Sequence, residues 1–176
     1  MNYQELACHS RVWIYQADRK LTKVEVGDIR SYGAKFIDQW AAHGSDLQAA
    51  FEVFYNQFIV LFADESQVKA SGCSIDSSVR FIKDIEQLYQ LDLFNRLNLT
   101  YKDDSEIKML VMADFQKALE EGVLNEETTV FNNLIETKED FVSKWEVPVK
   151  SSWHVNLITN RKYGKGSKSI RIHDGE

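Results

Sequence analysis

The sequence of 176 residues contains few cysteines and no apolar segment long enough to cross a bilayer. Its two cysteines, Cys8 and Cys73, are too few for a disulfide framework, so we expect both to be free thiols in a reducing compartment. A membrane-spanning helix needs about 20 largely apolar residues, and the first residues show no basic segment of the kind that opens a secretory signal. We therefore expect a cytoplasmic protein that does not insert into membranes.

The chain carries a formal net charge of −6 and so lacks the excess of positive charge that nucleic-acid binding requires. Basic side chains are concentrated locally between Arg161 and Arg171, in a segment with little apolar content. A terminus without apolar anchors stays loose in most proteins. We therefore interpret residues 159–176 as a basic, flexible tail and prefer this to a contact with nucleic acid or lipid. The expected partner is a protein or a small-molecule ligand, and nucleic acid is not expected.

Signatures of metal and cofactor binding are also missing. Neither cysteine belongs to a C-x2-C pair, and the four histidines are scattered along the chain: His9, His43, His154 and His173. Structural zinc sites use closely spaced pairs of such ligands. We therefore expect no metal and no cofactor.

The composition suits a globular core, with 44% hydrophobic and 27% charged residues. Thr22 and Glu25 form a capping-box pattern in front of apolar residues at helical spacing, and Gly44 ends this predicted helix. Together with segments rich in β-branched and aromatic residues, the pattern predicts the order βαββαβ. The predicted elements are a strand at 11–16, a helix at 22–42, strands at 49–55 and 58–63 joined at Asn56-Gln57, a helix at 75–90 and a strand at 97–102.

This order is that of a ferredoxin-like plait, an α+β fold with one four-stranded antiparallel sheet and both helices on the same face. We assign residues 1–103 to this domain. Residues 104–158 restart with a short strand, a helix stopped by Gly122 and a further short helix capped by Thr137, so they form a small α+β extension. Such a segment can bury only a small core by itself, and we expect it to pack on the plait.

Aromatic residues of the predicted sheet could form a stacking platform of the kind that RNA-binding plaits use. The chain is acidic and lacks the aromatic motif of those proteins, and the extension is expected to cover that face, so core packing is the preferred interpretation. These aromatic residues are Trp13, Tyr15, Phe51, Tyr55, Phe58 and Phe62.

Cys73 is the main candidate for chemistry. It lies in Ser71-Gly72-Cys73-Ser74-Ile75-Asp76, between a predicted strand and a predicted helix. A thiol near a helix N-terminus ionises more readily, because the helix dipole and free backbone N–H groups favour the thiolate. In a plait, the loop that carries Cys73 lies at the same sheet edge as the end of the first helix, where His43 stands. An imidazole that accepts the thiol proton is the minimum for nucleophilic catalysis, so Cys73 and His43 are the candidate catalytic residues.

The same edge should also hold Cys8 and His9, which precede the first strand. A structural interpretation competes with the catalytic one, because a small cysteine often starts a helix under a packed loop and His43 can cap the carbonyls at the end of its own helix. The connection from Asp64 to Cys73 is long for a strand-to-helix loop, which favours a functional interpretation. Whether the protein is an enzyme stays open at this point.

Four segments of the chain carry a resemblance to known sequences: Arg11-Val12-Trp13-Ile14-Tyr15-Gln16-Ala17, Ala41-Ala42-His43-Gly44, Ala70-Ser71-Gly72-Cys73-Ser74-Ile75-Asp76 and Val130-Phe131-Asn132-Asn133-Leu134. Together they resemble a family of short uncharacterised bacterial proteins that is often labelled "ABC transporter ATPase". The resemblance runs from about residue 11 to 157. It implies a bacterial cytoplasmic protein in which the segments of His43 and Cys73 belong to the family pattern.

The ATPase label conflicts with the sequence. An ABC ATPase needs G-x-x-x-x-G-K-[ST] between a strand and a helix, and the nearest match, Gly164-Lys165-Gly166-Ser167-Lys168-Ser169, has the wrong spacing. We therefore expect no specific ATP binding. The leading hypothesis is a non-enzymatic binding or interaction protein that is not a functional ABC-type ATPase. The alternative hypothesis is a thiol-dependent enzyme that uses Cys73 with His43.

Overall fold

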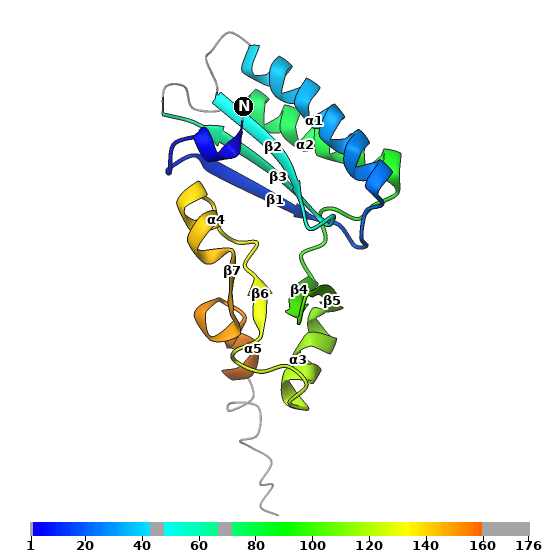
Figure 1. The fold of residues 1–176 in the computed structure, drawn as a ribbon, viewed down its shortest axis with the longest axis vertical. Helices are drawn as coiled ribbons and strands as arrows, with labels where there is room; N and C mark the ends of the chain where they lie inside the picture. The colour runs from blue at the N-terminus through cyan, green and yellow to red at the C-terminus, as the bar shows by residue number, and fades with distance from the viewer. Residues whose placement is uncertain (1, 43–47, 67–71, 160–176) are drawn as a thin grey trace, which may run out of the picture.

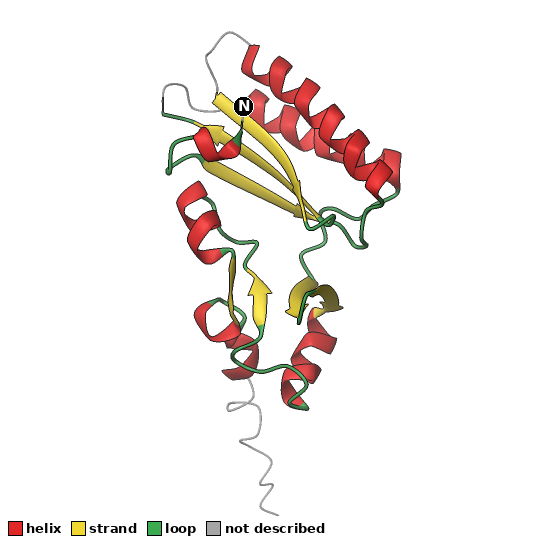
Figure 2. Ribbon diagram, in the orientation of Figure 1, coloured by secondary structure: helices red, strands yellow, loops and turns green. Residues whose placement is uncertain are grey.

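The computed structural model describes residues 2–42, 48–66 and 72–159, and within these ranges the chain forms two antiparallel sheets and five α-helices (Figure 1). The first sheet contains β1 (Arg11–Gln16), β2 (Gln48–Phe54) and β3 (Phe58–Asp64) in the order β1-β3-β2. Helices α1 (Lys23–Ala42) and α2 (Gly72–Tyr89) lie side by side on one face of this sheet, as predicted (Figure 2). The protein is therefore of the α+β class.

The second sheet has the order β5-β4-β6-β7. Its strands are β4 (Asn98–Asp103), β5 (Glu106–Val111), β6 (Thr129–Phe131) and β7 (Glu146–Pro148). The helices that accompany it are α3 (Met112–Glu120), α4 (Lys138–Lys144) and α5 (Val155–Thr159), and the short 3-10 turns are η1 (Tyr3–Glu5) and η2 (Val149–Ser151).

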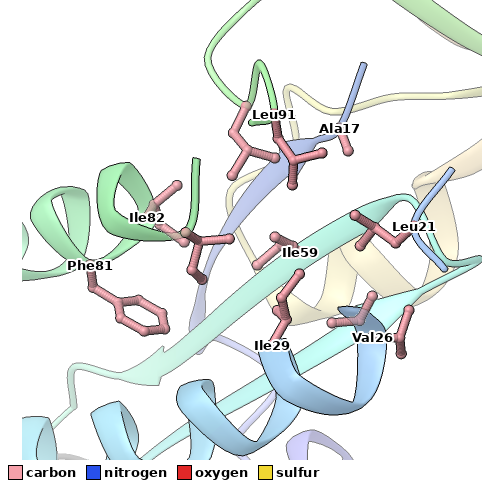
Figure 3. Close-up of a cluster of buried hydrophobic side chains, with 11 residues drawn as sticks. Ala17, Leu21, Val26, Ile29, Ile59, Phe81, Ile82 and Leu91 are labelled. Carbon is pink, nitrogen blue, oxygen red and sulfur yellow. The ribbon is translucent and has the colours of Figure 1, made fainter. Parts of the chain in front are cut away.

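The central strand β3 is buried on both of its faces, and its first six residues have no exposed surface. Side chains alternate between the two faces of a strand, so Ile59 lies on the helix side whereas Phe58 lies on the other. On the helix side, Ile59 packs with Ile29 of α1 and Ile82 of α2 (Figure 3). This cluster holds both helices on the sheet.

The opposite face of the first sheet is covered by the second half of the chain. Phe58 packs against Trp145 with ring centroids 5.1 Å apart, and Phe62 packs against Phe141 at 5.2 Å. Val60 belongs to the same buried cluster. The prediction that residues 104–158 pack on the first sheet is confirmed, and Phe58 and Phe62 are core residues that offer no stacking surface.

The prediction of one four-stranded sheet is wrong in its last strand. β4 pairs with β5 and β6 in the second sheet and does not join β1. The edge of β1 is contacted instead by the segment before α4, because the Val12 N–H donates to the Glu136 carbonyl at 2.9 Å and Arg11 forms a bridge with Thr137. A hairpin closed by two residues also costs less loop entropy than pairing with the distant β1. The domain boundary that we expect after residue 103 falls inside the hairpin of β4 and β5.

Several local boundaries differ from prediction by a few residues. Helix α2 begins at Gly72, whereas the apolar pattern predicts a start near 75. The turn between β2 and β3 is centred on Tyr55 and Asn56, which both have a φ angle of 53°. Gly122 follows α3 with a φ angle of 73°, as expected for a helix stop, and Thr137 caps α4 through the Asp140 N–H at 3.2 Å. The predicted stop at Gly44 and the basic tail from residue 160 onward lie outside the described residues.

Candidate functional site

The structure places the backbone of Cys73 in the first turn of α2. The Cys73 side chain lies outside what the structure describes, and His43 falls in the segment 43–47, which is not described either. The distance between the two side chains therefore stays a prediction.

The chain on either side of these two residues does come together. Gln48 and Asp64 are paired in β2 and β3, so the connection that enters β2 and the one that leaves β3 meet the sheet at the same end. The Trp40 indole N–H donates to the Ser74 carbonyl at 3.1 Å. This bond fixes the last turns of α1 against the first turn of α2.

The residues before β1 lie at the same end of the sheet, as predicted. His9 Nε2 is 3.3 Å from Asp64 Oδ1, and Cys8 is exposed. The pKa of Asp64 lies below its ordinary value, chiefly because the Ser66 backbone N–H donates to its carboxylate at 2.9 Å. Asp64 therefore carries a negative charge beside His9 at neutral pH.

A pocket of about 100 Å³ lies elsewhere, where β1 of the first sheet meets β4 and β6 of the second. Its apolar walls include Ile14, Phe131 and Trp153, and its polar walls include Thr100 and His154. The connection from α2 to β4 forms a further side. Polar and apolar side chains contribute about equally to the lining, and a hollow with converging polar groups is a candidate ligand site.

A chain of hydrogen bonds holds the pocket wall in place. Gln16 at the end of β1 donates to the Asn98 carbonyl at 3.1 Å and accepts from the Asn133 amide at 2.9 Å. Asn133 in turn accepts from the Trp145 indole N–H at 3.0 Å. These hydrogen bonds join the two sheets and hold the wall in one arrangement.

His154 is buried and neutral in this wall. Its side chain is 1% exposed, and burial lowers its pKa from 6.5 to about 4. The ring stacks on Trp153 with centroids 4.0 Å apart, and Nδ1 lies 2.8 Å from Ser152 Oγ. The imidazole therefore carries no charge at neutral pH.

Two buried polar atoms of this pocket lack a hydrogen-bond partner. In the described part of the chain, Thr100 Oγ1 and His154 Nε2 form no hydrogen bond, and Ser10 Oγ and Gln57 Oε1 share this property away from the pocket lining. Buried polar groups in proteins are paired in the great majority of cases. Both residues line the hollow, but these two atoms have almost no accessible surface, so they lie inside its wall.

The rim of the pocket combines apolar surface with one positive charge. Phe94 and Leu134 are exposed apolar side chains that line it, and Arg96 is an exposed cation beside them. Tyr15, also in the lining, packs edge-on against Phe94 with centroids 5.5 Å apart. Burial raises the pKa of Tyr15, so its phenol stays neutral.

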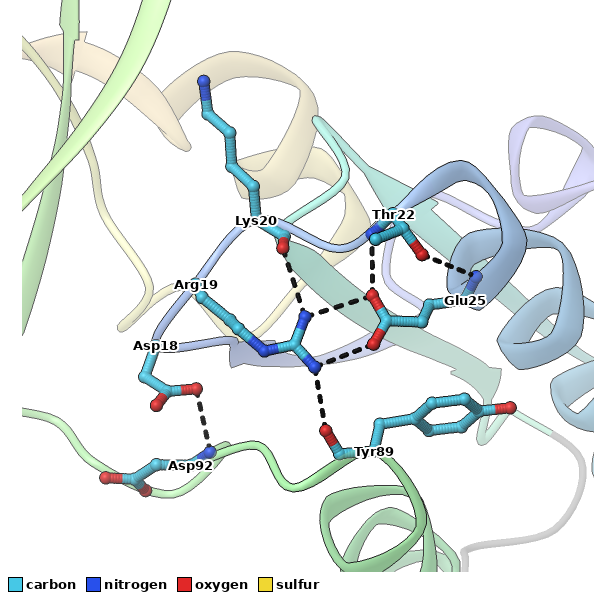
Figure 4. Close-up of polar contacts among 7 residues, drawn as sticks. All are labelled: Asp18, Arg19, Lys20, Thr22, Glu25, Tyr89 and Asp92. Carbon is cyan, nitrogen blue, oxygen red and sulfur yellow. Dashed lines mark hydrogen bonds and ion pairs between the residues drawn. The ribbon is translucent and has the colours of Figure 1, made fainter.

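The start of α1 forms the predicted capping box. The Thr22 N–H donates to the Glu25 carboxylate at 2.7 Å, and Thr22 Oγ1 accepts from the Glu25 N–H at 3.2 Å (Figure 4). Arg19 donates to both oxygens of Glu25, at 3.0 and 2.7 Å. The bonds from Arg19 lower the pKa of Glu25 to about 2, with the Thr22 backbone N–H adding to the effect.

This cluster also fixes the segment that leads into the pocket. Arg19 donates to the Tyr89 carbonyl at the end of α2 at 2.8 Å, and the Asp92 N–H donates to Asp18 at 3.0 Å (Figure 4). The connection from α2 to β4 is thereby tied to the connection from β1 to α1. The hydrogen bonds of Asp18 and Arg19 therefore hold the segment that forms one side of the pocket.

Sequence reasoning missed this pocket. Its lining comes from positions far apart in the chain, and His154 is one of four scattered histidines in the sequence. The usable signal is Gln16, a buried amide that ends a strand in which the four preceding residues are apolar or aromatic. Asn133 reads as a turn residue, although its side chain holds the wall.

No known protein family, curated protein or solved structure matches this chain. Within the described ranges, no group of three His, Cys, Asp or Glu side chains is placed to hold a metal ion. None of the helices in those ranges has both the length and the apolar character that a bilayer crossing needs.

Proposed function

We propose that the protein is a non-enzymatic binding protein whose ligand site is the pocket between the two sheets. The observation that carries this proposal is the hollow itself, which residues of both sheets line and which the hydrogen bonds of Gln16 and Asn133 hold in place. A wall that is already held in place loses little further freedom when a ligand binds.

The size of the pocket limits the ligand. A volume of about 100 Å³ is small beside the roughly 300–1,000 Å³ that drug-sized ligands and cofactors occupy. The pocket is therefore too small for ATP. The proposal that the protein does not act as an ABC-type ATPase rests on the missing phosphate-binding motif, and calorimetry that showed saturable micromolar ATP binding would contradict it.

The binding proposal is tested by titrating ¹⁵N-labelled protein with a library of small one-ring and two-ring compounds. We expect shifts concentrated on Ile14, Thr100 and His154. Leu134→Trp, at the exposed rim, should block these shifts, whereas Val123→Trp, at an exposed position outside the lining, should leave them unchanged. Shifts spread evenly over the surface, or equal binding by both variants, would contradict a site in this pocket.

The second candidate function is a thiol-dependent enzyme that uses Cys73 with His43. It is favoured by the bond from Trp40 to the Ser74 carbonyl, which brings the neighbouring turns of α1 and α2 together. A thiol in the first turn of a helix gains from the dipole, so Cys73 should react with iodoacetamide faster than the exposed Cys8. His43→Ala should slow that reaction and leave the rate at Cys8 unchanged. Equal rates at both cysteines in the parent protein would remove this candidate.

The cellular setting is also part of the proposal. The resemblance of the His43 and Cys73 segments to a family of bacterial proteins supports a bacterial, cytoplasmic protein. Fractionation of a bacterial host that expresses the chain tests the location, and recovery with the membrane or outside the cell would contradict it.

A further inference from the structure

We propose that the ligand of this pocket presents a single carboxylate on a short aliphatic body, and that Arg96 and the Tyr15 hydroxyl bind the carboxylate at the rim. This inference rests on the proposed function. Three features of the pocket support it: the charge of its lining, the missing ion-pair partner of Arg96 and the unpaired hydroxyl of Tyr15.

The lining carries one positive charge and no negative charge. Arg96 belongs to it, whereas no Asp or Glu is among the lining residues, all of which the structure describes. The whole chain has the opposite balance, with 27 acidic and 21 basic residues. His154 adds no charge, because burial lowers its pKa to about 4. A hollow lined by charge of one sign attracts a ligand of the opposite sign, so we expect an anion.

Arg96 has no ion-pair partner in the described part of the chain. Other arginines are paired with glutamates: Arg11 at 3.7 Å, Arg19 at 2.7 Å and Arg30 at 2.6 Å. An exposed arginine without a partner is not unusual by itself, and Arg80 of α2 is a second example within the described ranges. Arg96 differs from Arg80 because it lines a hollow. Its planar fork of N–H donors matches the two oxygens of a carboxylate.

Tyr15 supplies a second donor near this charge. Its hydroxyl forms no hydrogen bond with a described residue, and it is absent from the fully buried unpaired atoms, so it keeps contact with solvent. Thr100 Oγ1 and His154 Nε2, in contrast, lie inside the wall. The positive charge of Arg96 acts on the phenol, since it lowers the Tyr15 pKa against the larger effect of burial. The neutral phenol retains its hydrogen and can donate it to a carboxylate oxygen.

The hollow limits the body that follows the carboxylate. A dry cavity of about 150 Å³ holds benzene, and this hollow measures about 100 Å³. A short aliphatic chain therefore fits where a ring does not. Ile14, Leu93 and Phe131 offer it apolar contacts, while the carboxylate stays at the rim beside the exposed Arg96. Butyrate is a simple probe of this class.

The test compares butyrate with butyramide, which has nearly the same shape and no charge, and with n-butylammonium, which has the opposite charge. In titrations followed by ¹H–¹⁵N spectra, we expect butyrate to bind roughly 3- to 10-fold more tightly than butyramide. Arg96 is exposed, so added salt should reduce this preference. Butyramide binding as tightly as butyrate, or n-butylammonium binding more tightly, would overturn the inference.

Arg96→Gln should abolish the preference for butyrate. Arg80→Gln is the matched control, because it removes the same charge from an exposed, unpaired position outside the lining, and it should leave the preference unchanged. Equal effects of the two substitutions would contradict a site at Arg96. Tyr15→Phe keeps the ring that packs against Phe94 and should weaken butyrate binding several-fold. Unchanged binding by this variant would contradict the role of the hydroxyl.

Further comparisons separate the source of the carboxylate and the fate of the two proposals. Tighter binding of N-acetyl-Ala-Ala-Val, with a free terminal carboxylate, identifies the end of a partner chain as the source, and the reverse order identifies a free acid; both results support a carboxylate. If library compounds shift Ile14 and Thr100 while butyrate shows no preference over butyramide, the pocket is a binding site and the ligand charge is wrong. If neither the library nor the acids shift these residues, the proposed function fails as well.

Discussion

Replacing Gly33 by alanine tests how α1 packs on the first sheet. Gly33 is buried in the middle of α1, and a Cβ atom at this position would overlap the ring of Phe51 on β2, including its Cγ. Phe51 is itself packed edge-on against Phe81 of α2, with centroids 5.7 Å apart. Because Cγ is fixed close to the backbone, rotation of the ring does not relieve the overlap.

Gly27 supplies the matched control. It lies in the same helix, is exposed, and has open space where a Cβ atom would stand. Alanine at an unhindered helix position stabilises by roughly 0.5–1 kcal/mol relative to glycine. Gly27→Ala should therefore raise the free energy of unfolding by that amount, which corresponds to a rise in Tm of about 1–4 °C at this chain length.

Gly33→Ala gains the same helix propensity but overpacks the interface, which costs typically 1–3 kcal/mol. We expect a net loss of about 1–2 kcal/mol relative to the parent protein. Urea unfolding with an unchanged slope measures both variants on one scale. In the Gly33→Ala background, Phe51→Leu should cost less than it does alone, because the two positions touch. If Gly33→Ala stabilises as much as Gly27→Ala, the close packing of α1 on β2 is wrong.

Three further predictions concern charged and titrating groups. His154 binds its proton more weakly in the folded than in the unfolded protein. The free energy of unfolding should therefore fall by at most about 3 kcal/mol as the pH drops from about 6.5 to about 4. Urea unfolding measures this fall, and the His154→Gln variant should show a flatter pH dependence. Arg19→Ala should move the pKa of Glu25 up from about 2 toward its ordinary 4.5, which a carboxyl titration by NMR detects; an unchanged pKa would show that Arg19 is not its cause. Lys138→Met should lower the free energy of unfolding by roughly 1–3 kcal/mol, because the buried amine donates to the carbonyls of Gln4 and Leu6, and equal stability in urea would refute this role.

Local signals predicted most of the helices and strands. The Thr22 and Glu25 capping box and the Thr137 cap are interactions over three residues, so their outcome depends little on the rest of the fold. The apolar run of β3 predicts a strand and proves to be buried on both faces. Patterns of this kind do not specify which strand pairs with which.

The pairing of β4 was predicted wrongly. Its own sequence fits either sheet, and the decision lies with the hairpin to β5 and with the contact of Glu136 at the edge of β1. The pocket was missed for a related reason, since Gln16, Thr100 and His154 meet only after both sheets have formed. The backbone position of Cys73 at the start of a helix followed from neighbouring residues, whereas its relation to His43 remains a prediction.

The burial of β3 on both faces has a consequence for the protein during its synthesis. The cover for Phe58 and Phe62 includes Phe141 and Trp145, which leave the ribosome more than 75 residues later. At synthesis rates of roughly 5–20 residues per second, that interval lasts about 4–16 s. During that interval Phe58 and Phe62 lack this part of their cover on the nascent chain, so burial of the first sheet is completed only when the last third of the protein has been made.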